Sequence, residues 1–380
     1  MKSTLFLVAA LYVLAGCTTA KQMASSKDAF IDSSLVYAPQ AGEYASMRIP
    51  ALVISKKGTL LAFCEGRINN ASDWGDMNLL LRRSTDGGKT WEPYQVIAAK
   101  RTGGPAGNPA PVVAEDGTIH LLYQRDYAIA YHTQSADDGL TWSAAEDITY
   151  AFDKIKPQYS WNVLATGPGH AIQLKSGRLL VPVWLAASEK IQPHRGHAPS
   201  SIATIYSDDN GKTWNNGAVS AYNTPDFKSP NENMAVQLND GRVMINVRLG
   251  SKVNRRGVLY SPDGISNWSA PAYDTTLFDP VCMATINKVP LKDGSNAIIF
   301  INPDSRNIEK TPRKNLVVKL SYDEGKTWLV KKVLEPGFAG YSDVAIAPDG
   351  TIYCLYETND GKDWNYSLKL KKFNVGWLGR

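Results

Sequence analysis

The sequence predicts an all-β protein, a six-bladed β-propeller built on a repeated turn that we call the Asp box. Three observations lead to this prediction. One eight-residue motif recurs five times, the segments around its copies alternate apolar and polar residues, and no long helical periodicity interrupts them. The 380-residue chain is 43% hydrophobic and 20% charged, which excludes a disordered protein and is sufficient for a large core.

The Asp box reads Ser-x-Asp-x-Gly-x-Thr-Trp, and four near-perfect copies begin at Ser84, Ser135, Ser207 and Ser321. A degenerate copy at Ser261 lacks the Gly and the Thr in register. The Asp accepts hydrogen bonds from backbone amides in a tight turn, the Gly permits a positive φ, and the Trp buries apolar surface against the hairpin. Each copy therefore predicts a structural hairpin turn between two strands.

The spacing of the Asp boxes predicts the number of blades. The five copies lie about 59 residues apart on average, so the chain beyond its N-terminal segment holds roughly six such units. A closed ring leaves no exposed sheet edge, so a single domain accounts for the whole length. Further turns, each followed by alternating apolar residues, occur at 115–117, 175–177, 239–241 and 348–350.

Charge and cysteine content narrow the possible partners. The net charge of +5 is small and dispersed, which argues against a nucleic-acid partner but is compatible with a local basic pocket for an acidic ligand. The cysteines have no metal-ligand spacing, and the two His of the loop 192–197 lack a neighbouring carboxylate or Cys. We therefore expect no metal site, a surface loop at 192–197, and buried, unpaired thiols at Cys64, Cys282 and Cys354.

The N-terminus predicts a bacterial lipoprotein signal. Lys2 precedes an apolar run, 5–15, that is too short to span a bilayer and is typical of a secretory signal. The run ends in Leu-Ala-Gly before Cys17, which resembles a lipobox and implies acylation of Cys17; an ordinary signal with a coincidental Cys is the alternative. We expect an anchored protein of the bacterial cell envelope, periplasmic or on the cell surface. The expected organisation is a signal peptide at 1–16, a tether at 17–35 and the propeller at 36–380.

An Arg-Ile-Pro motif begins at Arg48. Together with the Asp boxes and the motifs described below, it resembles the bacterial, animal and viral exo-α-sialidases (neuraminidases) over about 44–357. The substrate of these enzymes carries a carboxylate on its anomeric carbon, and the planar, permanently charged guanidinium of Arg binds a carboxylate well. The resemblance implies three such arginines, Arg48, Arg248 and Arg313, with Arg306 as the alternative to Arg313.

The resemblance also implies a nucleophilic tyrosine. A carboxylate nucleophile would be repelled by the carboxylate of the substrate, whereas a neutral phenol is not. A phenol has a pKa of about 10 and therefore needs a base to attack at neutral pH. The family's Tyr-Ser-Asp motif matches Tyr341, and the family's base matches Glu232 in the segment Ser-Pro-Asn-Glu.

The acid of this family is an Asp on a loop before the first Asp box. The loop 69–76 contains two candidates, of which Asp73 has the closer spacing and Asp76 is the alternative. Arg67 matches an arginine near C4 of the sugar, which implies a substrate contact, with a structural ion pair as the alternative. The segment 104–109, near the family's acyl-group pocket, is built of small residues and leaves the tolerance for N-acyl variants open.

The resemblance thus implies a retaining exo-α-sialidase that removes terminal α-linked sialic acid from glycoproteins, glycolipids or oligosaccharides without a metal or organic cofactor. Asp73 would protonate the leaving oxygen while Tyr341, assisted by Glu232, attacks the anomeric carbon. One alternative is a trans-sialidase, including the intramolecular kind. Another is a non-catalytic propeller that binds sialylated glycans, which the combination of Tyr341, Glu232 and Asp73 disfavours. Linkage preference, membrane leaflet and oligomeric state stay open.

Overall fold

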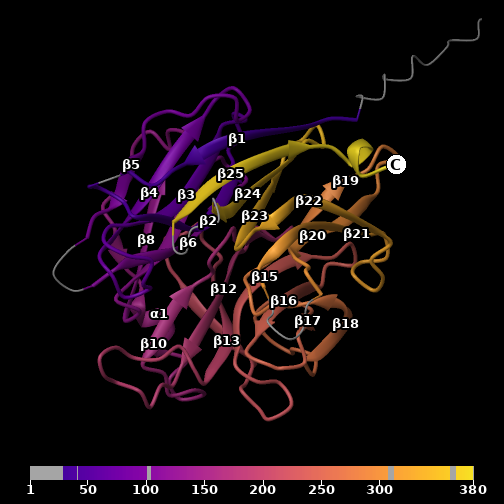
Figure 1. The fold of residues 1–380 in the computed structure, drawn as a ribbon. Helices are drawn as coiled ribbons and strands as arrows, with labels where there is room; N and C mark the ends of the chain where they lie inside the picture. The colour runs from indigo at the N-terminus through magenta and orange to yellow at the C-terminus, as the bar shows by residue number, and fades with distance from the viewer. Residues whose placement is uncertain (1–28, 41, 101–103, 307–311, 360–364, 380) are drawn as a thin grey trace, which may run out of the picture.

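The computed structural model describes residues 29–40, 42–100, 104–306, 312–359 and 365–379, which form six antiparallel sheets around a common axis (Figure 1). The predicted six-bladed β-propeller is confirmed. The expected signal peptide and Cys17 lie outside the described residues. Within those residues, no helix has the length and apolar character needed to cross a lipid bilayer.

The first three blades follow one another along the chain, and each is an antiparallel meander. Blade 1 contains β2 (Ser46–Ile54), β3 (Leu60–Arg67), β4 (Met77–Ser84) and β5 (Gln95–Ala98). Blade 2 contains β6 (Ala106–Val113), β7 (Ile119–Arg125), β8 (Ile129–Ser135) and β9 (Glu146–Asp147). Blade 3 contains β10 (Val163–Thr166), β11 (Ile172–Gln173), β12 (Leu179–Ala186), β13 (Ser200–Ser207) and β14 (Asn215–Ala221), and the short helix α1 (Thr149–Asp153) precedes it.

The last three blades complete the ring. Blade 4 contains β15 (Pro230–Gln237), β16 (Val243–Leu249), β17 (Arg255–Ser261) and β18 (Ala272–Phe278). Blade 5 contains β19 (Thr285–Pro290), β20 (Asn296–Pro303), β21 (Lys314–Ser321) and β22 (Val330–Phe338). Blade 6 contains β23 (Ser342–Ile346), β24 (Ile352–Asn359), β25 (Tyr366–Phe373) and, as its outer strand, β1 (Ile31–Tyr37); a 3₁₀ turn, η1 (Val375–Leu378), follows β25.

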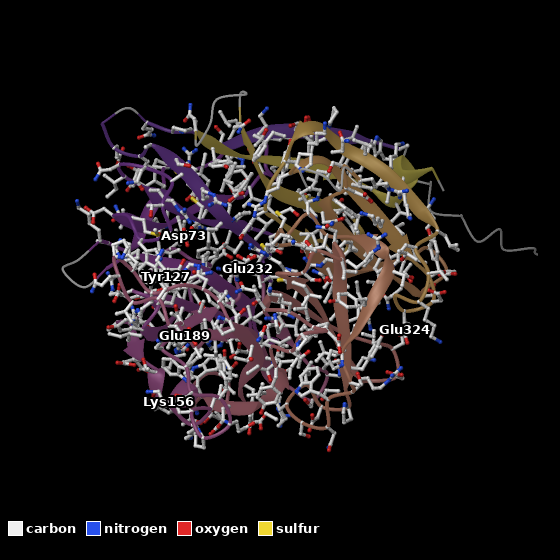
Figure 2. All side chains as sticks on the ribbon, turned by 60° about the horizontal axis from the view of Figure 1, so that its bottom comes forward. Asp73, Tyr127, Lys156, Glu189, Glu232 and Glu324 are labelled. Carbon is white, nitrogen blue, oxygen red and sulfur yellow. The ribbon has the colours of Figure 1, made fainter. Side chains whose placement is uncertain are left out.

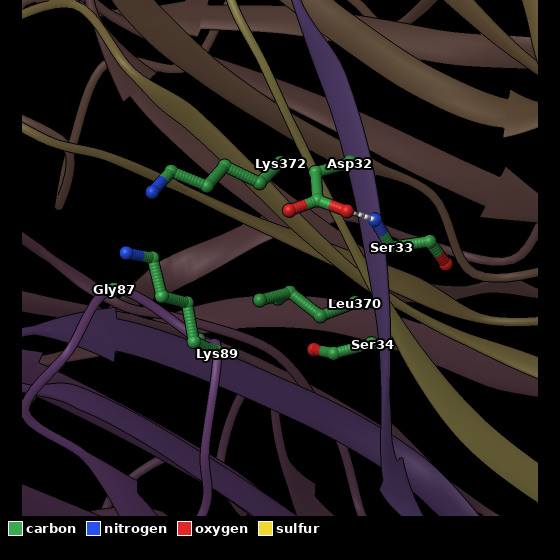
Figure 3. A pocket seen from close by; sticks show the side chains of 8 residues that line it. Asp32, Ser33, Ser34, Gly87, Lys89, Leu370 and Lys372 are labelled. Atoms are coloured by element: carbon green, nitrogen blue, oxygen red, sulfur yellow. Dashed lines mark hydrogen bonds between the residues drawn. The ribbon is translucent and has the colours of Figure 1, made fainter.

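The N-terminal strand closes the ring. β1 pairs antiparallel with β25, from Ile31 opposite Phe373 to Leu35 opposite Lys369, so the first and last described strands share one sheet. This corrects the expected boundary, because 31–35 belong to the propeller and not to the tether. A pocket of about 190 Å³ lies beside β1 and the first Asp box, between Lys89 and Lys372 (Figure 3).

The Asp boxes form the turns between the third and fourth strands, as predicted. In the first box, Ser84 Oγ donates to Asp86 Oδ1 at 2.8 Å and Thr90 Oγ1 donates to Asp86 Oδ2 at 2.6 Å. In the degenerate copy, Ser266 Oγ replaces the Thr and donates to Asp263 Oδ2 at 2.8 Å. In blade 6 the third strand, β25, and the fourth, β1, are not consecutive in the chain, so no turn of this kind joins them.

Apolar side chains pack mainly between neighbouring blades. Phe63, Leu79 and Leu81 of blade 1, for example, belong to one buried cluster with Ile119 and Leu121 of blade 2. The three described cysteines are buried and unpaired, as expected. Among the residues that the structure describes, no three His, Cys, Asp or Glu side chains gather as possible metal ligands.

The meander decides which residues share an end of the ring. Because strand direction alternates, the start of each first strand and the loop between each second and third strand lie at one end. The Asp boxes lie at the opposite end. Residues near the starts of β2, β15 and β23 and near the ends of β3, β16 and β24 are therefore brought together although they are far apart in the sequence.

Candidate functional site

The predicted site residues gather at the end of the ring opposite the Asp boxes. Arg48 lies in β2 and Glu232 in β15, both near the start of the strand, while Tyr341 directly precedes β23. Figure 2 shows Glu232 near Asp73 and Tyr127, which belong to the loops after β3 and β7. Closure of the six-bladed ring thus brings segments up to 308 residues apart into one cluster of side chains.

Tyr341 and Glu232 form a short hydrogen bond within this cluster. Tyr341 Oη donates to Glu232 Oε1 at 2.5 Å, and Arg248 Nη1 donates to Tyr341 Oη at 2.6 Å and to Glu232 Oε2 at 2.5 Å. Tyr341 is 5% exposed and Glu232 6%. The carboxylate is therefore positioned to take the phenolic proton, and the guanidinium is positioned to stabilise the phenolate that results.

Burial raises the pKa of Tyr341 above the usual value of a phenol. Arg248 opposes this shift, the negative charge of Glu232 adds to it, and Arg313 and Arg48 oppose it further. The net pKa stays high, so Tyr341 rests as a neutral phenol. Its proton can leave only in step with a reaction that removes the developing negative charge.

Three arginines surround the ring of Tyr341. The guanidinium carbons of Arg48, Arg313 and Arg248 lie 5.3, 5.2 and 6.0 Å from the ring centroid. Arg306 instead pairs with Asp304 at 3.3 Å and has a side chain that is 66% exposed. The structure therefore brings Arg313 to Tyr341 and leaves Arg306 outside this cluster. Three cations around one phenol form a local binding position for an anion.

Glu357, whose role the sequence reasoning missed, holds two of these groups in place. Its carboxylate accepts hydrogen bonds from Arg48 Nε at 3.1 Å, from Ile49 N at 3.0 Å and from Tyr341 N at 3.1 Å, and the residue is fully buried. A Cβ at Gly340 would lie 2.3 Å from Glu357 Oε2, so a larger residue there would displace this carboxylate. The one available signal was an acidic residue following the apolar segment Ile352–Tyr356.

Asp73, but not Asp76, belongs to the cluster. Asp73 Oδ1 lies 2.8 Å from Arg67 Nη2 and 3.9 Å from Arg48 Nη1, whereas Asp76 pairs with Lys100 at 3.0 Å. Burial raises the pKa of Asp73, but the positive charges of Arg67 and Arg48 lower it more, and the net pKa lies below the usual value. Its side chain remains 42% exposed, so a ligand can reach it.

Arg67 lies beneath this carboxylate in a buried ion pair. Its side chain is 1% exposed, and its Nη2 lies 2.6 Å from Glu65 Oε2 as well as 2.8 Å from Asp73. Glu65 Oε1 also accepts a hydrogen bond from Asn108 N at 2.9 Å. Arg67 thus connects blade 1 to the loop that carries Asp73, while its contact with a substrate stays a prediction.

The loop 192–197, expected to be a surface loop, contacts the loop of Asp73. His194 is exposed, yet its ring stacks on Trp74 with a centroid distance of 5.2 Å and an interplanar angle of 3°. His197 is partly buried and lies 4.6 Å from the ring of Tyr127. The loop lies at the surface, as predicted, since 192–194 are exposed, and its rings also pack against Trp74, the residue next to Asp73.

Curated proteins with a similar amino-acid sequence are named as sialidases. A sialidase of Micromonospora viridifaciens is 32% identical over 362 residues, covering 88% of this chain and 52% of that protein. A sialidase of Bacteroides fragilis is 31% identical and covers 86% of this chain and 62% of that protein. The chain therefore spans about half to three fifths of the length of these two curated relatives.

Solved structures agree with the architecture. The Hadza microbial sialidase Hz136 has a TM-score of 0.76 and 25% identity, covering 90% of this chain and 68% of that one. A leech intramolecular trans-sialidase has a TM-score of 0.74 at 18% identity over 91% of this chain and 70% of that one, which shows the fold alone. The family model of the BNR repeat-like domain matches residues 45–354. The chain therefore belongs to the BNR repeat-like domain family, with the propeller fold of the sialidases.

Proposed function

We propose that the protein is a retaining exo-α-sialidase that hydrolyses terminal α-linked sialic acid, with sialylated glycoproteins, glycolipids or oligosaccharides as its substrates. The observation that carries the proposal is the Tyr341–Glu232 pair, joined by a 2.5 Å hydrogen bond and surrounded by three arginines. The relatives that share most of this chain are named as sialidases, which supports the same activity.

The arginines provide the binding position for the substrate carboxylate. Arg48, Arg248 and Arg313 come from three blades and surround one phenol, so an anion between them meets positive charge from several sides. Glu357 pairs with Arg48 and Glu232 pairs with Arg248, whereas Arg313 donates to the backbone oxygen of Val281 and keeps its charge for an anion. A monosaccharide with a carboxylate on its anomeric carbon would thereby place that carbon beside Tyr341.

In the first chemical step, Tyr341 Oη attacks the anomeric carbon while its proton passes to Glu232. The bond between the anomeric carbon and the glycosidic oxygen breaks, and Asp73 donates its proton to that oxygen. In the second step, Asp73 as a base takes a proton from water, whose oxygen attacks the anomeric carbon. Tyr341 then leaves as it recovers its proton from Glu232, and two displacements at one carbon retain its configuration.

The electrostatics of Asp73 fit a change of role on binding. In the free protein, Arg67 and Arg48 hold the pKa of Asp73 below its usual value, which favours the ionised form. A bound carboxylate would neutralise part of the charge of Arg48 and raise the pKa of Asp73. The substrate itself would thus promote protonation of the acid that its cleavage requires.

Proton NMR of the purified protein with 3′-sialyllactose tests this proposal. We expect the α-anomer of free sialic acid to appear first with the wild type, and to be lost with Tyr341→Phe. If a 2,7-anhydro sugar or a transferred sialic acid forms, the reaction is that of a trans-sialidase and not hydrolysis. Absence of product from every linkage isomer would contradict catalysis and favour a binding propeller.

The sequence expectation of a lipid anchor at Cys17 is likewise a proposal, as is the resulting place in the bacterial cell envelope. It is supported by the Leu-Ala-Gly-Cys segment after an apolar run. Metabolic labelling with a palmitate analogue should label the wild-type protein and leave Cys17→Ser unlabelled. Equal labelling of both proteins, or none of either, would contradict the anchor.

A further inference from the structure

Trp74 directly follows Asp73 and is covered by side chains from blade 3. We propose that residues 194–197, which we call the 194–197 clamp, act through Trp74 as positioning residues that hold Asp73 where it can protonate the leaving oxygen. The inference rests on the proposed function, because it takes Asp73 as the acid. It adds that catalysis also depends on residues outside the cluster around Tyr341.

The ring of Trp74 is contacted by two other blades. His194 stacks on it with a centroid distance of 5.2 Å and an angle of 3°, and the guanidinium carbon of Arg195 lies 5.5 Å from its centroid. Tyr127 of blade 2 lies 4.8 Å from it, and His197 lies 5.6 Å from it. A stacked ring, a cation and two tilted rings thus limit the rotation of Trp74 and with it the backbone at Asp73.

The clamp is itself anchored to the body of the propeller. Arg195 Nη2 donates to Asp126 Oδ2 at 2.9 Å, and Arg195 Nη1 donates to Asn162 O at 3.2 Å. Gly196 N donates to Ser188 Oγ at 2.8 Å, which closes the loop on its own base. Contacts of Trp74 with this loop therefore connect the acid loop of blade 1 to segments next to the strands of blades 2 and 3.

His197 joins the clamp to the core. Its ring lies 4.6 Å from Tyr127 and 5.2 Å from Trp184, both of which are buried. Burial lowers the pKa of His197, while the carboxylates of Asp73 and Glu232 raise it and Arg248 and Arg67 oppose them. The net pKa lies below the usual value, so the imidazole is neutral at neutral pH and packs as an aromatic ring.

Asp73 needs such support because its own contacts leave it adjustable. Its side chain is 42% exposed, and its close ion pair with Arg67 fixes one oxygen at 2.8 Å. Proton transfer requires the carboxyl group to lie within hydrogen-bonding distance of the leaving oxygen. A misplacement of about 1 Å in a catalytic group can cost on the order of 100-fold in rate, so loosening Trp74 should impair the acid specifically.

The test compares two leaving groups. The glycosidic oxygen of 3′-sialyllactose needs a proton to depart, whereas the nitrophenolate of 4-nitrophenyl α-sialoside leaves without one. For Trp74→Ala we expect kcat/KM on sialyllactose to fall by about 10- to 100-fold, with a change of under about 3-fold on the nitrophenyl substrate. His194→Ala should show the same selectivity at about 3- to 10-fold, and Trp74→Phe, which keeps a ring, should restore most of the activity.

Two further variants give the result a single meaning. Trp142→Ala removes a partly buried Trp from an Asp box at the other end of the ring, 5.9 Å from Phe63, and should show no selectivity between substrates. Asp73→Ala should show the largest selectivity. If Asp73→Ala is selective but Trp74→Ala lowers both substrates equally or neither, the clamp is wrong and the acid stands. If Asp73→Ala is unselective, the acid assignment fails and the clamp fails with it.

Discussion

The two ends of the propeller use carboxylates differently. At the Asp-box end, Asp137 accepts hydrogen bonds from Ser135 Oγ at 2.8 Å and from Thr141 N at 2.9 Å, so its partners lie within four residues. At the other end, Glu357 accepts hydrogen bonds from Arg48 and Ile49, which are 309 and 308 residues away. Asp137, with local partners, thus builds a turn, whereas Glu357, with distant partners, helps to assemble the candidate site.

Protonation follows the same division. The hydrogen bond from the Thr141 hydroxyl, together with that from its backbone amide, lowers the pKa of Asp137 to about 2, so this carboxylate is ionised at any ordinary pH. Burial raises the pKa of Tyr341 at the other end, which keeps a reactive group neutral until it is used. The ionised Asp137 stabilises the fold, and the neutral Tyr341 keeps a proton that it can transfer during a reaction.

The largest expected effect is at Tyr341. Tyr341→Phe keeps the ring among the three arginines and removes only Oη, so we expect kcat/KM on 3′-sialyllactose to fall by about 1000-fold or more. The melting temperature should change by no more than about 2 °C, because Arg248 still pairs with Glu232 at 2.5 Å. Turnover close to that of the wild type would exclude Tyr341 as the nucleophile.

Glu357→Gln should have the next largest effect. The change removes the charge that orients Arg48 while nearly preserving the shape of the side chain, and we expect kcat/KM to fall by about 100-fold. Glu335→Gln is the matched control, since Glu335 lies in the neighbouring blade and accepts a hydrogen bond from Tyr356 Oη at 2.6 Å. Steady-state kinetics that find equal losses in the two variants would show that Glu357 has no special role.

The Asp boxes should affect stability and not activity. Asp137→Ala removes hydrogen bonds within one turn, and we expect the free energy of unfolding to fall by about 2 kcal/mol. Because this turn lies at the other end of the ring, kcat/KM should stay within about 2-fold of the wild type. Urea unfolding and kinetics on the same samples check both expectations, and an activity loss in the still-folded variant would break the division between the ends.

The smallest expected effect is a change in acid sensitivity near the third Asp box. His120 Nδ1 and His132 Nε2 lie 3.0 Å apart in the core, and a Cβ at Gly211 would lie 2.6 Å from His120. Burial, and then the charge of His120, lowers the pKa of His132 to about 4. The unfolded chain takes up this proton near pH 6.5, so stability is present above that pH and is lost as the pH falls toward 4.

Replacing one imidazole should reduce this loss. For His132→Gln, the difference in melting temperature between pH 7 and pH 5 should be smaller than for the wild type, although the variant can be less stable at pH 7. Thermal unfolding followed by circular dichroism at both pH values measures it. An unchanged difference would mean that other groups dominate the acid response.

Motif-bearing residues were predictable because each stands in a local pattern. The Asp boxes are recognisable from a few neighbouring residues, and Arg48, Tyr341 and Glu232 lie in short segments that resemble sialidase motifs. β1 was harder to delimit, since its segment Ile31–Tyr37 is mostly exposed and does not alternate apolar and polar residues. An outer strand buries little surface, so its boundary depends on pairing with β25 and not on its own composition.

Choices between similar residues needed the tertiary structure. Arg313 and Arg306 are seven residues apart, and Asp73 and Asp76 are three apart, so sequence position favoured Arg313 and Asp73 but left Arg306 and Asp76 as alternatives. Only the placement of Arg313 beside Tyr341, 5.2 Å from its ring, made the distinction. The contacts of Trp74 with 194–197 were invisible for the same reason, since stacking between blades leaves no local pattern.

Three results could be read from the sequence: the hairpin turns from residue types within a few positions, the six blades from Asp boxes about 59 residues apart, and the candidate chemistry from motifs that resemble those of the sialidases. The tertiary structure decided that Arg313 lies beside Tyr341, that Asp73 pairs with Arg67, that Glu357 holds Arg48, and that His194 covers Trp74. These outcomes depend on ring closure, which brings together side chains from different blades. Local sequence shows which chemical group each side chain offers, whereas the distances between these side chains are set when the ring closes.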